Sequence, residues 1–206
     1  IVRETGASLV LLFRGGKNRR DDYLELLALL YTVLRTVRTK GMLGLEKDIE
    51  RPHESPLFQQ FPRFLKQERA IRFLTDYLRL FSLGADRPAE MEALMDEELS
   101  TMNKEFHRAP RSLNMVAEAL PALGIVAAVL GMIKAMGSIS APPEVLGKLI
   151  GGALVGTFMG IFLAYCLAAP IAGRLKGIAE EESQFYGVIK TAIVAHLGGY
   201  APQVSI

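Results

Sequence analysis

The feature that most limits the fold of this sequence is a stretch of 25 residues, 149–173, without a charged side chain. A helix of that length, at about 1.5 Å per residue, exceeds the hydrocarbon core of a bilayer, which is about 30 Å thick. Charged side chains are much more frequent in soluble domains of ordinary composition. The stretch therefore predicts a transmembrane helix, which we place at residues 146–173.

A weaker candidate span precedes it at residues 113–136, where Glu118 and Lys134 interrupt the apolar run. The uncharged part, residues 119–133, is marginal for a spanning helix on its own. Because only the short link 137–145 separates the two candidates, the simplest interpretation is a transmembrane helical hairpin.

Charged residues are concentrated before this hairpin. Of the 24 Lys and Arg, 19 lie in residues 1–112, together with 17 of the 22 Asp and Glu. Basic residues stand next to both outer ends of the hairpin, namely Lys104, Arg108, Arg111, Arg174 and Lys176. Since positive charge favours the cytoplasmic side, residues 1–112 and 174–206 are expected in the cytoplasm and the link 137–145 outside.

Outside the hairpin, apolar residues recur at helical spacing and show no convincing strand alternation. We predict helices over 21–40, 43–50, 64–83 and 88–106, a further amphipathic helix after the second span, and a loop for the final GYAPQVSI. The expected fold is an all-α membrane protein, with a helical cytoplasmic domain, a transmembrane helical hairpin and a C-terminal cytoplasmic helix.

Several classes of function find no support in the sequence. A net charge of +2 does not suggest a nucleic-acid partner. Zinc-finger spacing, a Walker loop and a dinucleotide fingerprint are missing, and no nucleophile, base and orienting group form a recognisable pattern. The single Cys166 cannot form an internal disulfide. We therefore expect no enzyme, no metal site and no cofactor.

The second span carries small residues at strict four-residue intervals, namely Gly152, Gly156, Gly160, Ala164 and Ala168. Residues at this spacing share one helix face, and small residues let membrane helices approach closely. The face could pack within the hairpin or between subunits. Its length, in a chain with two spans, favours packing between subunits.

Four hairpin residues differ chemically from their surroundings. Thr157 could line an ion path, or its hydroxyl could only bind the carbonyl of the preceding turn. Glu118 could take part in ion transfer, since acids in membranes are expensive, or lie at the interface. Pro121 and Pro170 could be structural kinks or could transmit motion.

In the charged region, Arg38 and Glu46 lie on either side of Gly41. Charged residues around a helix end are usually only solvated. A protein-contact surface that uses electrostatic complementarity is the alternative.

Seven stretches of the chain resemble, in order, the flagellar stator A subunit (the MotA/PomA family). They are LLALLY, KGMLGLEKDIERPHES, DYLRL, LMDEEL, ALPALGIVAAVLG, LVGTFMGIFLAYCLAAP and GYAP. The segments ALPALGIVAAVLG and VGTFMGI are specific. The family has four spans, and the resemblance begins just after the second, so we expect the first two spans to be absent from this sequence.

This resemblance implies an ion-conducting stator of the bacterial flagellar motor in the inner membrane. A pentamer of A subunits would surround a dimer of the B subunit (MotB-like), whose single span carries a proton-accepting Asp. Ion flow would turn the ring of A subunits and push the rotor. By position, Arg38 and Glu46 match the charged pair that contacts the rotor protein FliG, and Pro121 and Pro170 match two prolines tied to coupling.

The resemblance also implies an ion path. Thr157 matches a pore-side hydroxyl, and Glu118 falls where the family also has an acidic residue. Sodium-driven relatives look to have Thr at the position of Ala128, which would pair two hydroxyl oxygens for a hard cation. Ala128 offers no oxygen ligand, so we expect protons.

Two alternatives remain. An ExbB- or TolQ-type energiser of outer-membrane transport belongs to the same superfamily, but it would not be expected to share the DIERPHES and LMDEEL stretches. A non-conducting membrane scaffold would need no hydroxyl, acid or kinks in the span cores.

Overall fold

The structure, a computed structural model, describes residues 20–84 and 87–206. All regular elements within these residues are helical, which confirms the predicted all-α class. The described residues form two compact units. We call residues 107–178 the hairpin unit, and the described residues from 20 to 106 together with 179–206 the helical unit.

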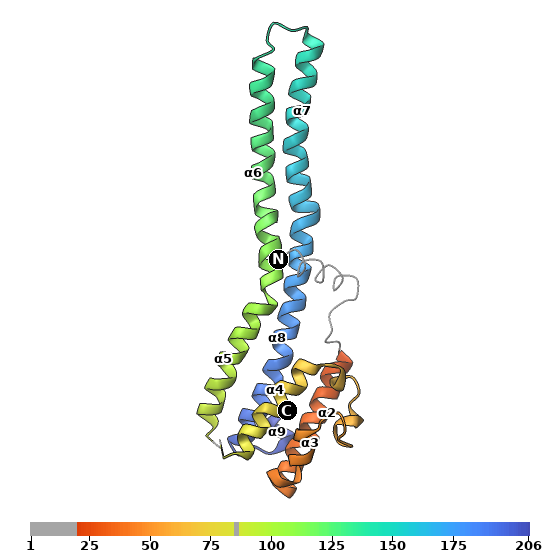
Figure 1. Cartoon of the computed structure of the whole chain (residues 1–206), viewed down its shortest axis with the longest axis vertical. Coiled ribbons are helices and arrows are strands. Elements are labelled where there is room, and N and C mark those ends of the chain that lie inside the picture. Colours follow the sequence, from red (N-terminus) through yellow and green to blue (C-terminus); the bar gives the residue numbers. More distant parts are fainter. Residues whose placement is uncertain (1–19, 85–86) are drawn as a thin grey trace. The chain divides into compact units, whose positions relative to one another are not determined.

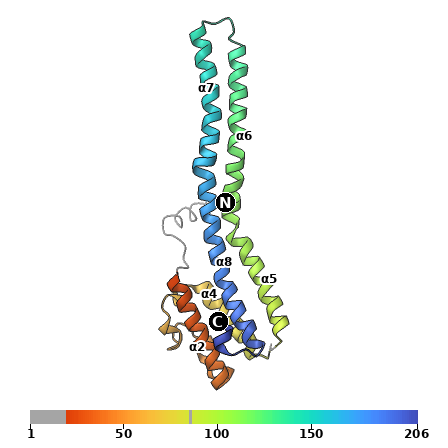
Figure 2. The same cartoon turned by 180° about the vertical axis from the view of Figure 1, so that it is seen from behind.

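The hairpin unit is built from two long antiparallel helices. Helix α6 (Arg108–Met136) and helix α7 (Pro143–Phe162) lie side by side along their length (Figures 1 and 2). The chain continues from α7 through a π-helical segment, η4 (Leu163–Ala168), into helix α8 (Ala169–Leu197).

Two helices in this part of the chain extend beyond the spans that the sequence predicts. Helix α6 begins at Arg108, not at residue 113, because Pro110 lies in the first turn, where proline is tolerated. The second span and the C-terminal helix are one continuous helical stretch from Pro143 to Leu197. Residues 174–182 include no proline, so nothing interrupts the backbone hydrogen bonding there.

Both long helical stretches, Arg108–Met136 and Pro143–Leu197, are long and apolar enough to cross a membrane. In their most apolar windows only 11% and 17% of the residues are buried inside the chain. The core helix of a soluble protein would be mostly buried. The exposed apolar side chains therefore support a membrane-embedded hairpin.

The helical unit contains the remaining elements. They are α2 (Arg20–Lys40), η1 (Met42–Gly44), α3 (Glu46–Glu50), η2 (Phe58–Gln60), η3 (Phe64–Lys66), α4 (Glu68–Ser82), α5 (Pro88–Phe106), the second half of α8 and α9 (Pro202–Ser205). The short helix α9 occupies part of the tail that we predicted to be a loop. Its Pro202 is buried, so the tail packs on the unit instead of extending into solvent.

The core of the helical unit joins α2 and α4 to the second half of α8. Leu30 and Leu74 are fully buried, and so is Phe185 of α8. The ring of Phe185 meets Tyr23 edge-on at 5.4 Å. Residues 179–206 therefore belong to the same compact unit as the N-terminal helices.

A charged contact ties α5 to α8. The Nζ atom of Lys190 lies 2.7 Å from Oδ1 of Asp96 and 3.2 Å from Oε1 of Glu92. Only 18% of the Lys190 side chain is exposed. The hydrogen bond with Asp96 is the main reason why the pKa of Lys190 is raised.

Candidate functional site

The two helices of the hairpin approach almost to backbone contact. A Cβ atom on Gly160 would lie 2.7 Å from the carbonyl oxygen of Leu120 and 2.9 Å from the Cα of Gly124. A Cβ atom on Gly131 would lie 2.5 Å from the Cβ of Ala153. These positions cannot carry a side chain without moving one helix away from the other.

The small-residue face of the second span is used inside the hairpin. A Cβ atom on Gly156 would lie 3.0 Å from the Cβ of Ala127 on α6, and both Ala164 and Ala168 are buried. Of the three glycines on this face, only Gly152 would have no atom of the described residues within 4 Å of a Cβ. The prediction that this face packs between subunits is therefore wrong from Gly156 onward, because α6 already occupies it.

Thr157 lies in this contact region. Its hydroxyl is 3.4 Å from the carbonyl oxygen of Gly124 on α6, so it reaches across the hairpin and not to its own preceding turn. Such a distance is long for a hydroxyl donor, and the hydroxyl stays available to a closer partner. Ala128 lies one turn along α6 from Gly124 on the same face. The structure thus brings the positions of Thr157 and Ala128 to one part of the hairpin.

Glu118 is not part of this contact. Its Oε1 accepts a hydrogen bond from the Asn114 side-chain amide one turn earlier on α6, at 2.6 Å, and both groups are exposed. Glu118 precedes Gly124 by six residues, which is about 9 Å along the helix. The structure therefore does not place its carboxylate beside the Thr157 hydroxyl.

The two prolines behave differently. Pro121 lies inside α6, which continues through it. Pro170 follows the π-helical segment η4. Proline cannot donate to the carbonyl four residues earlier and its ring collides with that carbonyl, here that of Cys166. The wider turn of η4 therefore coincides with the residues that must make room for the Pro170 ring.

A short apolar groove, of about 290 Å³, follows α6 and the chain around η4. Its lining includes Leu113 and Leu120 of α6, Leu163 and Leu167 of η4, and Ile171 of α8. All of these residues belong to the hairpin unit.

In the helical unit, the last turns of α2 carry two arginines that form no ion pair with the described residues. Arg35 and Arg38 are exposed, and neither forms an ion pair with any residue that the structure describes. Both line a hollow of about 390 Å³ between α2 and α9, together with Tyr31 and Gln203. Burial, and secondly the positive charge of Arg38, lowers the pKa of His196. Sequence analysis missed Arg35, although its three-residue spacing from Arg38 places it on the same side of α2.

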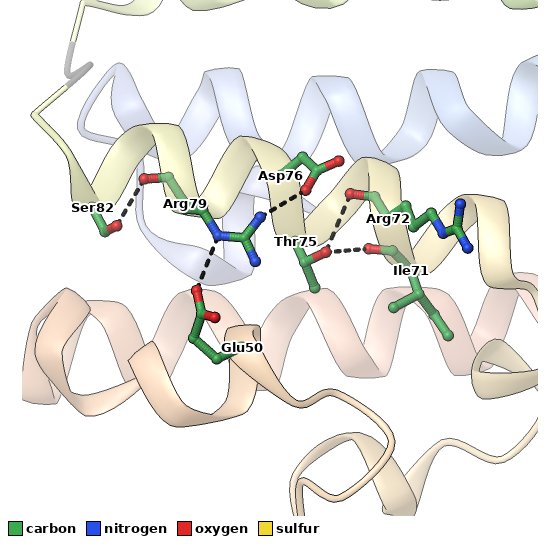
Figure 3. A network of polar contacts seen from close by, with 7 residues as sticks. All are labelled: Glu50, Ile71, Arg72, Thr75, Asp76, Arg79 and Ser82. Carbon is green, nitrogen blue, oxygen red and sulfur yellow. Dashed lines mark hydrogen bonds and ion pairs between the residues drawn. The ribbon is translucent and has the colours of Figure 1, made fainter.

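Glu46 begins α3, and its neighbours along the chain are already engaged. The Ser55 hydroxyl donates to Asp48 at 2.5 Å. Nε of Arg79 on α4 donates to Glu50 at 3.1 Å, as Figure 3 shows. Glu46 itself is exposed and forms no ion pair within the described part of the chain. It lines a second hollow, of about 620 Å³.

Arg38 and Glu46 therefore do not bind each other; they line separate hollows, one formed by residues of α2 and the C-terminal tail and the other by residues of α3 and the loop after it. Each is a charge that the fold leaves without an ion-pair partner among the described residues. Exposed charges of this kind are common on protein surfaces, and this arrangement leaves both groups accessible to another molecule.

Comparison with known proteins decides the family. Residues 66–187 match the model of the MotA/TolQ/ExbB proton channel family. Motility protein A of Escherichia coli K12 is 43% identical over 205 residues, which make up 100% of this chain and 70% of that protein. Motility protein A of Salmonella typhimurium LT2 is 42% identical over the same shares. This chain belongs to the MotA/TolQ/ExbB proton channel family.

The fold agrees with this family. The structure of MotAB from C. jejuni superposes on 99% of this chain and 71% of that chain, with a TM-score of 0.76 and 23% identity. The arrangement of helices is therefore similar to that of MotAB from C. jejuni.

Within the MotA/TolQ/ExbB family, the relatives that match along the whole of this chain favour a stator over a transport energiser. The family match covers Ala128 and Thr157 but begins after Arg38 and Glu46. The two motility proteins match the whole chain, including the segment that carries both charges. The predicted resemblance to the flagellar stator A subunit is confirmed, and these relatives are motility proteins and not enzymes.

Proposed function

We propose that this chain works as the A subunit of a proton-driven flagellar stator. The observation that carries the proposal is the similarity to motility protein A along the entire chain, together with a hairpin packed as closely as glycine allows. A rigid helix pair that carries few charges is suited to hold one wall of an ion path. The second wall would come from the span of a B subunit, as the name MotAB of the solved relative suggests.

The ion path would pass Thr157. Its hydroxyl is loosely held by the Gly124 carbonyl and can turn to a closer partner. Ala128, one helical turn from Gly124, contributes no oxygen, so this part of the hairpin lacks the ligand set that a hard cation such as Na⁺ prefers. Protons need only a series of hydroxyl, carboxyl or water groups, and Glu118 supplies an exposed carboxyl earlier in α6.

The rotor contact would be made by Arg38 and Glu46, with FliG as the partner. This assignment is supported by the exposure of both charges, whereas Asp48 and Glu50 have partners inside the helical unit. A rotor surface with an acidic group facing Arg38 and a basic group facing Glu46 would bind both charges.

The topology follows from charge. Residues 1–112 and 174–206 would lie in the cytoplasm, the link 137–145 in the periplasm, and the hairpin in the inner membrane. Several copies of the chain, in a pentamer by resemblance, would surround a dimer of B subunits. The exposed apolar surface of both long helices supports contact with lipid or with further subunits.

The test is soft-agar swimming of a strain that lacks its own A subunit and receives the complete gene with its B partner. We expect swimming to be restored, and we expect Arg38→Glu plus Glu46→Lys to reduce the swimming ring at equal membrane level. A matched control is Arg87→Glu plus Glu90→Lys, which exchanges the charges of an exposed pair formed by Glu90 in the first turn of α5 and by Arg87, the residue before that helix. It should leave swimming unchanged.

Absence of rescue by the unchanged chain, despite membrane insertion and B-subunit binding, would contradict the proposal. It would favour the transport-energiser interpretation. Equal loss in the control variant would show that the charge exchange damages the helical unit and not a rotor contact.

A further inference from the structure

One apolar side chain stands out from the charged end of the helical unit. Leu43 is 86% exposed, and no large apolar side chain in the described residues is more exposed. It is the central residue of η1, between Arg38 and Glu46. Isolated exposed leucines are common on protein surfaces, so exposure alone gives Leu43 no role.

The turn that carries Leu43 is held in one conformation. Gly41 has a φ of 71°, which favours glycine. A Cβ atom on Gly44 would lie 2.6 Å from the Cβ of Lys40. Gly44 donates its N–H to the Gly41 carbonyl at 3.2 Å, and Leu45 donates to the Met42 carbonyl at 2.9 Å.

The residues on both sides of Leu43 are anchored in the core. Leu45 is fully buried, and Met42 packs against the core of the helical unit. Helix α3, which begins directly after Leu45, is tied to α4 by the contact between Glu50 and Arg79 (Figure 3). Leu43 is therefore an apolar group that the fold holds in solvent on a constrained backbone, so that little backbone entropy is left to lose on binding.

We propose that Leu43 is the apolar anchor of the contact that Arg38 and Glu46 orient. The partner would be a protein surface with an apolar hollow, an acidic group on the Arg38 side and a basic group on the Glu46 side. The inference rests on the proposed function, because it assigns Leu43 to the rotor contact. Charges at the rim of a contact set encounter and register, while a side chain that becomes fully desolvated near the centre contributes more to affinity.

The experiment uses the complete A and B subunits in nanodiscs and purified FliG of the same organism as the probe. Binding is measured at low and at high salt for Leu43→Ser, for Leu43→Met and for the Arg38→Glu plus Glu46→Lys variant. Leu83→Ser is the matched control, since Leu83 is 78% exposed but lies at the end of α4.

We expect Leu43→Ser to weaken binding roughly ten- to a hundredfold, as the loss of one buried leucine implies. The loss should persist at high salt, whereas the effect of the charge variant should shrink because salt screens charges. Leu43→Met should bind within about threefold of the unchanged complex, since it conserves volume and apolarity. Leu83→Ser should bind normally.

Normal binding by Leu43→Ser, with a clear loss in the charge variant, would overturn the inference and leave the proposed function intact. No FliG binding by the unchanged complex would contradict the proposed rotor contact and the inference with it. If Leu43→Ser instead dissociates the A subunits, Leu43 lies between copies of this chain, and the inference is wrong.

Discussion

At the scale of single residues, the close packing of the hairpin depends on glycines, which have no side chain to hold the two helices apart. Gly160 touches α6 so closely that even a methyl group would meet the backbone of Leu120 and Gly124. We expect Gly160→Ala to lower the stability of the complex by roughly 1–3 kcal/mol, the usual effect of overpacking. Thermal unfolding of the detergent-solubilised complex would show it as a lower melting temperature.

The control for this variant is Gly147→Ala in the same helix, where a Cβ atom meets no described atom within 4 Å. It should leave the melting temperature unchanged or raise it slightly, because alanine is a better helix residue than glycine. If both variants melt alike, the close contact in the hairpin is not what holds the two helices together.

Thr157 offers a second residue-scale test. Thr157→Val keeps the shape of the side chain and removes the hydroxyl, including its long contact with the Gly124 carbonyl. Because that contact is weak, we expect normal assembly but at least a tenfold loss of proton flux in vesicles that hold the A and B subunits. Thr191→Val, a control on the helical unit with an exposed hydroxyl, should keep full flux. Normal flux in Thr157→Val would remove Thr157 from the ion path.

Sequence reasoning found the chemically unusual residues but not their neighbours. Thr157, Glu118 and the two prolines stand out because each contradicts its apolar surroundings. The partner of Thr157 could not be predicted, since which carbonyl it meets depends on how two helices are aligned. Likewise Leu43 is one apolar residue among many, and only the fold shows that Met42 and Leu45 turn inward while it turns outward.

At the scale of elements, the contact of Lys190 with Asp96 and Glu92 holds α5 against α8. We expect Lys190→Met to lower stability by roughly 1–2 kcal/mol at neutral pH, because it leaves two acidic groups facing each other without a cation. The matching control is Arg87→Met, which removes an ion pair that is 76% and 68% exposed and should change stability by at most about 0.5 kcal/mol.

The pH dependence of this effect has a definite sign. The pKa of Lys190 is raised above its usual value of 10.5. A raised pKa means that the folded state favours the charged form, so the stabilisation is complete below pH 10.5 and is lost as the pH rises through the folded value. The melting-temperature difference between Lys190→Met and the unchanged protein should therefore be constant from pH 7 to 9 and shrink in stronger alkali. A difference that grows with pH would contradict this account.

Helix positions were largely predictable, whereas the irregular segments between them were not. The spacing of apolar residues predicts 88–106, and α5 spans Pro88–Phe106. The predicted helix 43–50 is instead η1 followed by α3, because Gly41 and Gly44 permit a tight turn that periodicity does not reveal. The π-helical segment η4 could not be predicted either, since apolar spacing says nothing about how a helix accommodates Pro170.

At the scale of the whole molecule, the sequence separates an apolar part from a charged part, and the structure has two compact units that correspond to them. The sequence did not reveal that residues 179–206 join the N-terminal helices in one core. Phe185 and Ile189 are spaced like any amphipathic helix, and their partners on α2 and α4 are more than a hundred residues away. Such long-range pairing is set by shape, which a single sequence does not display.

The central claim, a stator driven by protons, is tested most directly by the rotation of tethered cells that depend on this A subunit and its B partner. We predict steady rotation in medium without sodium and arrest within seconds of adding a protonophore. Rotation that needs sodium, or that survives the protonophore while a sodium gradient remains, would contradict the claim.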